Sequence, residues 1–170
     1  RHLLEGFALA DSWTTDAHKW PNAGYDSGIS FVRHPHALRN AMSMSAAYLP
    51  VTAVREPIHY TPEMSRRARG VELWAALRSL GRTGMADLVD RCCAYADQFA
   101  RGLAADGHAI LNDVALNQVL VSFGSPERTA KVIAELQKEG TMWAGPTEWH
   151  GQYAMRISVS SWATRNEDID

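Results

Sequence analysis

Apolar residues recur every three or four positions along one long stretch of the chain, which is the spacing of one face of an α-helix. The stripe consists of Met85, Leu88, Cys92, Tyr95, Phe99 and Leu103. Gly107 follows it and predicts the end of the helix, because glycine adopts the left-handed conformation of a C-terminal cap at little cost. The pattern therefore predicts a helix whose stripe packs into a hydrophobic core.

A second helix is predicted just before this one. Thr61 provides an N-cap, Pro62 suits the first turn, and Gly81 ends the element. The residues expected on its core face are Val71, Trp74, Leu77 and Leu80. Its first turns also carry Arg66, Arg67 and Arg69. These arginines are interpreted as a solvated or structural face rather than as an anion-binding patch.

Shorter patterns complete the expected fold. Two further helices are predicted, from Pro35 through Met42 and from Pro126 through Lys138, the latter capped by Ser125 and ended by Gly140. The predicted strands are 11–16, 29–33, 109–111, 119–123, 141–144 and 153–160. Because strands alternate with helices, the sequence predicts an α/β fold in which helices cover a sheet.

The stretch from Ala10 to Trp20 carries the most informative chemistry. Lys19 follows His18 and lies between Trp13 and Trp20 in the sequence. A neighbouring cation and an apolar environment both favour the neutral form of an amine, which can attack a carbonyl carbon. The same residues are compatible with an ordinary lysine in a polar surface loop. The spacing alone leaves open whether Lys19 forms a Schiff base with pyridoxal phosphate.

This stretch, continued through Asn22 and residues 25–33, resembles the cofactor-lysine segment of the pyridoxal-phosphate-dependent group II amino acid decarboxylases. That family includes the aromatic amino acid and glutamate decarboxylases. The later blocks of the family are resembled, in the same order, by 65–70, 73–74, 77–81, 112–113, 117–121 and 155–160. The resemblance implies an α/β fold of fold-type I, with the end of the large domain in residues 1–61 and most of the small C-terminal domain in residues 62–170.

The resemblance also implies roles for individual residues. Lys19 would hold pyridoxal 5'-phosphate as a Schiff base, and His18 would lie against the cofactor's phosphate. Arg156 would bind the substrate's α-carboxylate, since a guanidinium binds a carboxylate through two parallel hydrogen bonds. Two alternatives remain open: His18 only shapes the turn, and Arg156 forms an ion pair with an acid on a strand. Asp16 stands where many relatives have asparagine and is given no role.

The sequence departs from the family in the loop from Tyr48 to Thr61, which has no clear period. Decarboxylating relatives carry a tyrosine there that is thought to protonate the α-carbon, and Pro57 stands at that point here. His59 and Tyr60 follow and are the candidate proton donors. Alternatively, the loop acts only as a lid against water. The missing tyrosine leaves open a different outcome, such as transamination or oxidative deamination.

Composition narrows the class of protein further. A formal net charge of −2 and a pI of about 6.4 give no electrostatic reason to expect nucleic acid or an anionic membrane as a partner. No apolar run approaches the roughly 20 residues of a membrane span. Cys92 and Cys93, adjacent on a predicted helix, suit neither a disulfide with each other nor a zinc site. We therefore expect reduced thiols, no metal and a cytoplasmic protein.

The ends of the chain suggest a piece of a longer enzyme. It begins at Arg1, and Thr164 and Glu167 near its end have the spacing of a capping box for a further helix. We expect PLP-dependent decarboxylation of an L-amino acid to the amine and carbon dioxide, in a homodimer, with the fragment alone inactive. The alternatives are another fold-type I reaction, of aminotransferase or lyase type, and a non-catalytic dimerisation or interaction fragment.

Overall fold

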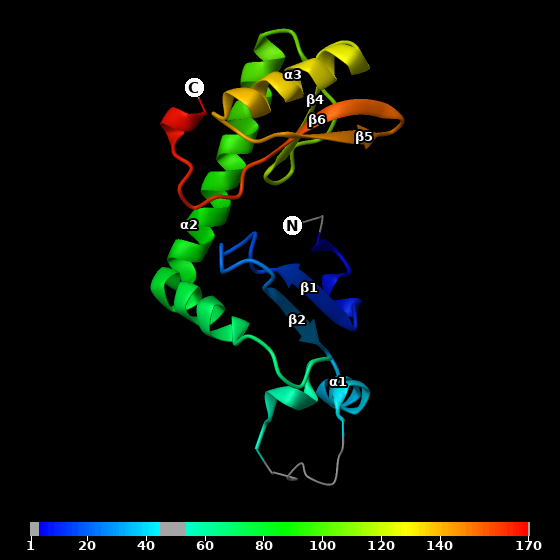
Figure 1. Ribbon diagram of the computed structural model, residues 1–170, viewed down its shortest axis with the longest axis vertical. Helices are drawn as coiled ribbons and strands as arrows, with labels where there is room; N and C mark the ends of the chain where they lie inside the picture. Colours follow the sequence, from blue (N-terminus) through cyan, green and yellow to red (C-terminus); the bar gives the residue numbers. More distant parts are fainter. Residues whose placement is uncertain (1–3, 45–53, 170) are drawn as a thin grey trace. The chain divides into compact units, whose positions relative to one another are not determined.

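The computed structural model describes residues 4–44 and 54–169 (Figure 1). By backbone proximity the chain divides into two compact units. Unit 1 is Arg1–His18 with Ala23–Ala75, and unit 2 is Lys19–Asn22 with Ala76–Asp170. The division falls inside a helix, and the four residues that begin with Lys19 belong to unit 2. The expected domain boundary after Thr61 stays a prediction.

Unit 1 contains a two-stranded antiparallel sheet. Strand β1 (Ser12–Asp16) pairs with β2 (Gly28–Val32), with Thr14 opposite Ser30, and helix α1 (Pro35–Met42) follows. These elements confirm the predicted strands and the predicted short helix. The short 3-10 turns η2 (Phe7–Leu9) and η3 (Pro57–His59) complete the unit. Its buried residues among those described are Ala17, Ala23 and Ser27, so unit 1 has few large side chains in its interior.

Helix α2 (Arg69–Ala105) replaces the two helices expected between residues 61 and 107. Gly81 interrupts its dihedral angles, with φ 63° and ψ −173°, so the predicted break is present as a kink inside one element. The predicted N-cap at Thr61 is wrong. The Thr61 hydroxyl donates to the carbonyl oxygens of Pro57 and Glu63, at 3.4 and 3.0 Å, and residues 62–68 are not helical.

The predicted core face before the kink is also wrong for most of its residues. Val71, Trp74 and Leu77 are 63%, 66% and 42% exposed, and Leu80 packs against the hydrophobic core. Because Gly81 departs from helical geometry, the stripe before it does not continue into the buried stripe after it. The buried residues of α2 are Leu88, Cys92, Ala96 and Ala100. The predicted stripe is confirmed for Leu88 and Cys92, and for Tyr95, Phe99 and Leu103, which pack partly buried against the core, whereas Met85 is not among the described core residues.

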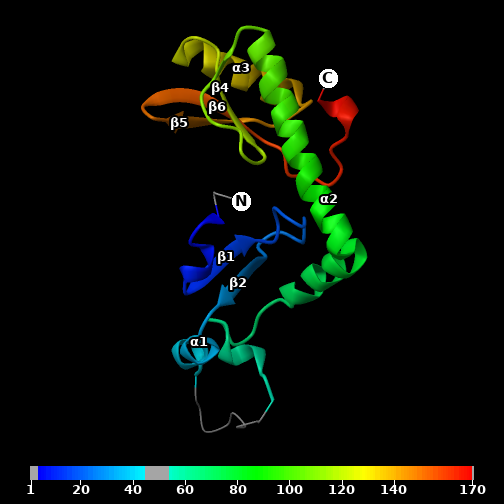
Figure 2. The same ribbon diagram turned by 180° about the vertical axis from the view of Figure 1, so that it is seen from behind.

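Unit 2 is built on a four-stranded antiparallel sheet in the order β3-β4-β6-β5. Its elements are β3 (Ala109–Ile110), β4 (Gln118–Ser122), α3 (Pro126–Glu139), β5 (Gly145–Trp149) and β6 (Gln152–Ser158). Helix α3 and the C-terminal part of α2 lie on one side of this sheet in both views (Figures 1 and 2). The side chains between them include Leu88, Val119, Val121, Ile133, Met155 and Ile157.

Local signals explain where the elements of unit 2 begin and end. The Ser125 hydroxyl accepts the backbone N–H of Arg128, and Gly140 ends α3 with φ 83°, as the sequence predicts. The predicted strand at 141–144 is wrong, because the Gln137 side chain donates to the Ala144 carbonyl and strand pairing starts only at Gly145. Gly145–Trp149 lacks an alternating apolar pattern, so no local pattern predicts β5.

The expected cap near the end of the chain is shifted by one residue. The final turn is the 3-10 helix η4 (Asn166–Asp168), and the Asp168 carboxylate accepts the backbone N–H of Arg165 at 2.8 Å. Thr164 is therefore not the N-cap. Within the described ranges, no helix has both the length and the apolar content that a membrane span requires. Both cysteines are free thiols, and burial raises the pKa of each.

Candidate active site

Lys19 opens a turn that is anchored in unit 2. Its side chain is exposed, whereas Trp20, the next residue, packs against the hydrophobic core. Pro21 follows a cis peptide bond and is buried. The Trp20 side chain lies near the thiol of Cys92 on α2. The two residues after Lys19 thus hold the turn, while the Lys19 side chain is exposed.

Asn22 holds the other end of this turn. Its Nδ2 donates to the carbonyl oxygen of Lys19 and to that of Ser160, the latter at 2.9 Å. Its Oδ1 accepts the backbone N–H of Trp162 at 2.6 Å. Asn22 has a φ of 61°, a left-handed conformation that asparagine adopts more readily than most residues. The turn is therefore bonded to the chain that follows strand β6.

Arg156 lies on β6 in the same unit. It is opposite Leu120 of β4 and Gly145 of β5, and it alternates with the buried residues Met155 and Ile157. Its side chain consequently stands on the sheet face away from the core cluster and is exposed. Within residues 4–44 and 54–169, no acid forms an ion pair with Arg156. The described residues thus give no support to the alternative of an ion-paired strand arginine.

His18 ends the first segment of unit 1 and is half-buried. Its backbone N–H and its Nδ1 both face the carbonyl oxygen of Ser27, at 3.3 and 3.1 Å. Its ring lies 4.8 Å from the ring of Tyr25, measured between centroids. Because a carbonyl oxygen only accepts, Nδ1 must carry the proton of this bond. Nε2 is the ring nitrogen left to meet a ligand.

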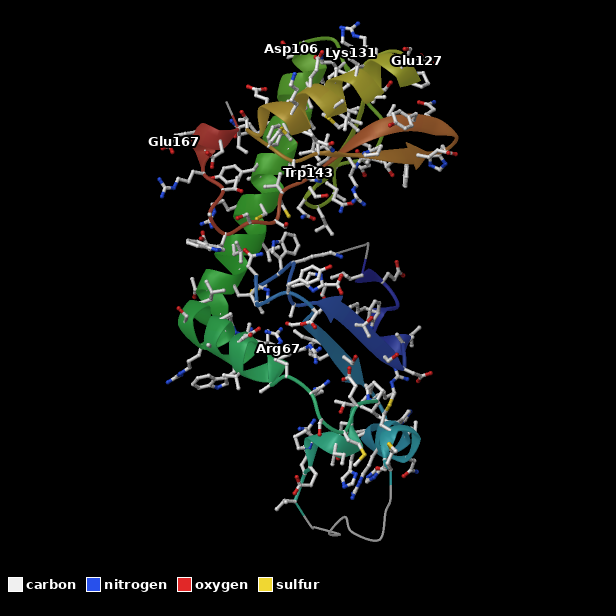
Figure 3. All side chains as sticks on the ribbon, viewed as in Figure 1. Arg67, Asp106, Glu127, Lys131, Trp143 and Glu167 are labelled. Atoms are coloured by element: carbon white, nitrogen blue, oxygen red, sulfur yellow. The ribbon has the colours of Figure 1, made fainter. Side chains whose placement is uncertain are left out.

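A cluster of ion pairs holds the segment that orients His18. Arg67 and Arg69 both bind the Asp26 carboxylate, each at 2.8 Å, and Arg67 also donates to the carbonyl oxygen of Tyr25. Hydrogen bonds from Arg69, and then from Arg67, lower the pKa of Asp26 from 3.8 to about 2. Figure 3 labels Arg67 near the start of α2. The predicted structural role of the arginines is confirmed for Arg67 and Arg69.

Glu72 extends this cluster. Its Oε1 pairs with Arg67 at 2.5 Å, and its Oε2 is buried without a hydrogen-bond partner among the described residues. A methyl group at position 24 would collide with this carboxylate, so Gly24 leaves the room that Glu72 occupies. The sequence showed the arginines and Glu72 on one predicted helix but gave no sign that Asp26 is their shared partner.

The candidate proton donors lie on and just after η3. His59 is half-buried, and its Nδ1 has no hydrogen-bond partner among the described residues. The guanidinium of Arg55 lies 4.4 Å from the centroid of the Tyr60 ring, a distance typical of a cation–π contact. The expected lid spans residues 51–61, and residues 51–53 lie outside the described residues. Its function as a lid stays a prediction.

Cavities and metal sites add nothing to this set. A cavity of about 380 Å³ in unit 1 is lined in part by Asp26, Glu63 and Arg66, and by none of the predicted site residues. In the described part of the chain, no three His, Cys, Asp or Glu side chains converge as metal ligands. The structure therefore places Lys19 and Arg156 in unit 2, and His18, His59 and Tyr60 in unit 1.

The residues present fit pyridoxal phosphate. An exposed primary amine on a fixed turn suits a bond to the cofactor's aldehyde carbon. An imidazole whose Nδ1 is already engaged by Ser27 can donate from a protonated Nε2 to a phosphate oxygen. An exposed arginine on strand β6, such as Arg156, suits a carboxylate. Each of these residues, taken by itself, is compatible with a fold-type I enzyme that depends on pyridoxal phosphate.

Comparison with known proteins supports this class and narrows it. Residues 1–125 match the pyridoxal-dependent decarboxylase conserved domain, and the chain belongs to that family. It is 30% identical to the aromatic-L-amino-acid decarboxylase of Drosophila lebanonensis, over 100% of this chain and 43% of that protein. It is 28% identical to the histidine decarboxylase of Mus musculus, over 99% of this chain and 26% of that protein.

Solved structures show the same fold. The crystal structure of TDC from Oryza sativa with PLP and tryptamine matches with a TM-score of 0.89 and 20% identity, over 99% of this chain and 38% of that one. Mouse CSAD in its apo form matches with a TM-score of 0.84 and 21% identity, over 100% of this chain and 40% of that one. The chain thus spans less than half the length of these relatives, and the expected fold-type I architecture is confirmed.

Proposed function

We propose that this chain carries the cofactor lysine and the substrate-binding arginine of an enzyme that decarboxylates an L-amino acid to the amine and carbon dioxide. The observation that carries the proposal is Lys19, exposed on an anchored turn inside the matched family domain. Relatives are named decarboxylases of aromatic amino acids, histidine and tyrosine, so decarboxylation is their shared reaction. The side chain of the substrate is left open.

Each residue has a task that its surroundings allow. When bound, pyridoxal phosphate withdraws electrons from the substrate's α-carbon and so weakens the bonds to that carbon. Lys19 holds the cofactor covalently through Nζ, and His18 donates from Nε2 to its phosphate. Arg156 binds the substrate's carboxylate through two parallel hydrogen bonds, which fixes the orientation of the bond that breaks. Tyr60 or His59 returns a proton to the α-carbon after carbon dioxide leaves.

A second outcome is favoured by one specific observation. By the family resemblance, Pro57 stands at the position of the loop tyrosine of the decarboxylating relatives, and a proline side chain has no dissociable proton. If neither Tyr60 nor His59 replaces that tyrosine, the enzyme would release a carbonyl product instead of the amine. This would occur by transamination, in which the cofactor would retain the amino group, or by oxidative deamination, in which dioxygen would be the oxidant and ammonia would leave. A structural neighbour with a TM-score of 0.82 is named 4-hydroxyphenylacetaldehyde synthase. Its name states an aldehyde product, and this supports a carbonyl product as the second outcome proposed for this chain.

The test of the proposal is a product assay on the full-length protein with candidate amino acids. We expect carbon dioxide and the amine in equal amounts, and borohydride reduction should fix the cofactor on the peptide that contains Lys19. Lys19→Ala should abolish both results. A label on Lys131 or Lys138 would contradict the assignment of Lys19, and a keto acid or an aldehyde as the main product would favour the second outcome.

Homodimerisation and a cytoplasmic location are further proposals that rest on the family resemblance. Fold-type I enzymes build their active sites between two subunits, so an isolated 170-residue chain should lack activity. Size-exclusion chromatography with light scattering on the full-length protein tests the dimer. A monomer with full activity would contradict it.

A further inference from the structure

We infer that Asn22 is a positioning residue that sets Lys19 relative to the strand that carries Arg156. The inference rests on the proposed function for the roles of Lys19 and Arg156, whereas the hydrogen bonds of Asn22 are features of unit 2 itself. The side-chain amide of Asn22 would thus link the backbone at Lys19, which binds the cofactor, to the chain that follows Arg156, which binds the substrate.

Asn22 is hydrogen-bonded to a segment of chain that the sheet of unit 2 holds in place. Strand β6 is paired on both sides, with β4 and with β5, so it is held by two ladders of backbone hydrogen bonds. Ser160, whose carbonyl oxygen accepts from Asn22, follows Arg156 by four residues, or about 13 Å of extended chain. The Val159 N–H also donates to the Asn117 carbonyl oxygen at 2.9 Å. The chain after Arg156 is therefore a fixed reference.

The side-chain amide of Asn22 can donate and accept hydrogen bonds at the same time. A primary amide offers two N–H donors and one oxygen acceptor, and Asn22 uses both kinds toward Lys19, Ser160 and Trp162. Aspartate has nearly the same shape and would keep the acceptor for Trp162, but its carboxylate would repel the two carbonyl oxygens. Glycine would accept the φ of 61° without strain and would remove all three bonds.

The effect of Asn22 on the position of Lys19 can be distinguished from an effect on the stability of the fold. Trp20 packs against the core and Pro21 is buried, so burial already attaches the turn to unit 2. Loss of the Asn22 amide should leave this packing in place and release the backbone at Lys19. The effect should therefore appear in how fast and how firmly Lys19 bonds to the cofactor, more than in the unfolding temperature.

Asn112 provides a matched control. Its Nδ2 donates to the carbonyl oxygen of Gln118 at 3.1 Å, and its Oδ1 accepts the backbone N–H of Leu120 at 2.8 Å. Like Asn22, it is half-buried. It is hydrogen-bonded to the backbone of strand β4 and, in the described structure, has no hydrogen bond to residues 19–22. The same substitution at the two positions thus disrupts the same kind of side-chain-to-backbone hydrogen bonds. At position 22 these bonds include one to Lys19, and at position 112 they do not.

The experiment compares Asn22→Asp with Asn112→Asp in full-length protein. The rate of covalent attachment is followed by visible absorption after apoprotein is mixed with pyridoxal phosphate, and borohydride then fixes the cofactor for peptide mapping. Asn22→Asp should slow attachment at Lys19 by about tenfold, whereas Asn112→Asp should leave it within about twofold of wild type. Equal effects of the two substitutions, or a wild-type rate in Asn22→Asp, would overturn the inference.

A second measurement does not use the cofactor. In apoprotein, hydrogen exchange of the Trp162 amide should be faster in Asn22→Gly than in wild type and unchanged in Asn112→Gly. Unchanged exchange in Asn22→Gly would overturn the inference, and so would faster exchange with unaltered attachment at Lys19. If wild-type protein attaches no cofactor at Lys19, the proposed function is wrong. In that case the rate of hydrogen exchange at the Trp162 amide still tests whether the Asn22 side chain makes its hydrogen bonds, because this measurement does not need the cofactor.

Discussion

Arg156 illustrates how the surroundings of a single residue limit its possible roles. A strand arginine usually gains from a nearby acid, yet the described structure provides none for Arg156. By contrast, Arg67 and Arg69 share Asp26 as a partner at short distances and act within the fold. An exposed guanidinium with its donors still available fits the binding of a carboxylate from outside the chain.

We expect Arg156→Lys to weaken binding of the amino acid and to leave binding of the cofactor unchanged. A point charge replaces a two-pronged donor, and a lost hydrogen bond to a charged group costs about 1.5–3 kcal/mol, or roughly tenfold to somewhat over a hundredfold in KM. Steady-state kinetics and cofactor titration measure the two effects. Arg101→Lys, in an exposed ion pair with Asp97, is the control. A wild-type KM with lower thermal stability would instead indicate a structural role.

Tyr60 and His59 can be separated by substitution. The His59 Nδ1 is buried, whereas the Tyr60 ring lies beside Arg55 on the described part of the loop. We expect Tyr60→Phe to slow amine formation by about 10²–10⁴-fold and to divert product toward a carbonyl compound, as loss of a general acid does. His59→Gln should have a smaller effect. The reverse order would assign the proton to His59, and full activity of both variants would contradict both assignments.

Among the elements, the connection between the β1–β2 hairpin and the start of α2 is carried by charge rather than by apolar contact. Asp26 lies just before β2, and the two arginines that bind it lie at and just before the first turn of α2. Residues 54–61 lie between the two in the sequence. The ion pairs of Asp26 therefore contribute to the structure of unit 1, and the free energy of unfolding should depend on pH through them.

Asp26→Asn should destabilise the protein at neutral pH, and the difference from wild type should vanish in acid. The folded-state pKa of Asp26 is lowered to about 2 from a usual 3.8, so its contribution is present above 3.8 and is lost as the pH falls toward 2. Urea unfolding of both proteins between pH 2 and pH 6 measures this. Asp97→Asn removes an exposed pair and should change little. A pH-independent difference would contradict the assigned cause.

At the scale of the whole molecule, the hydrophobic core belongs to unit 2. Residues of α2, α3, β4 and β6 form one cluster, whereas the buried residues described in unit 1 are two alanines and a serine. Isolated two-stranded sheets are marginally stable in water, because they bury too little apolar surface. Stability should therefore be distributed unequally between the units.

Ile133→Ala should cost about 2–5 kcal/mol, since it leaves a cavity in a packed core. Ile133 is 5% exposed on α3, whereas Val71 in unit 1 is 63% exposed. Val71→Ala should stay within about 0.5 kcal/mol of wild type. Chemical denaturation of the 170-residue chain compares the two. Similar losses in both variants would show that Val71 is covered by another surface under the conditions of the measurement.

The amino-acid sequence by itself determined the features that depend on local spacing. Residues near one another in the chain predict the buried positions Leu88 and Cys92, the Ser125 cap and the end of α3 at Gly140. They also carry the family resemblance around Lys19. Each reflects a periodicity or a cap that acts within a few residues. For the same reason the strands at 12–16 and 152–158 could be predicted from their patterns.

Only the tertiary structure decided which distant residues meet. Thr61 has the sequence of an N-cap, but its hydroxyl bonds to Pro57 and Glu63, and the helix starts at Arg69. Strand β5 forms because the backbone of β6 supplies its hydrogen-bond partners. No local pattern within Gly145–Trp149 predicts this pairing. Asn22 bonds to Ser160 and Trp162, far along the chain. Hydrogen bonds and ion pairs of this kind depend on the approach of separate segments, so one-dimensional spacing does not encode them.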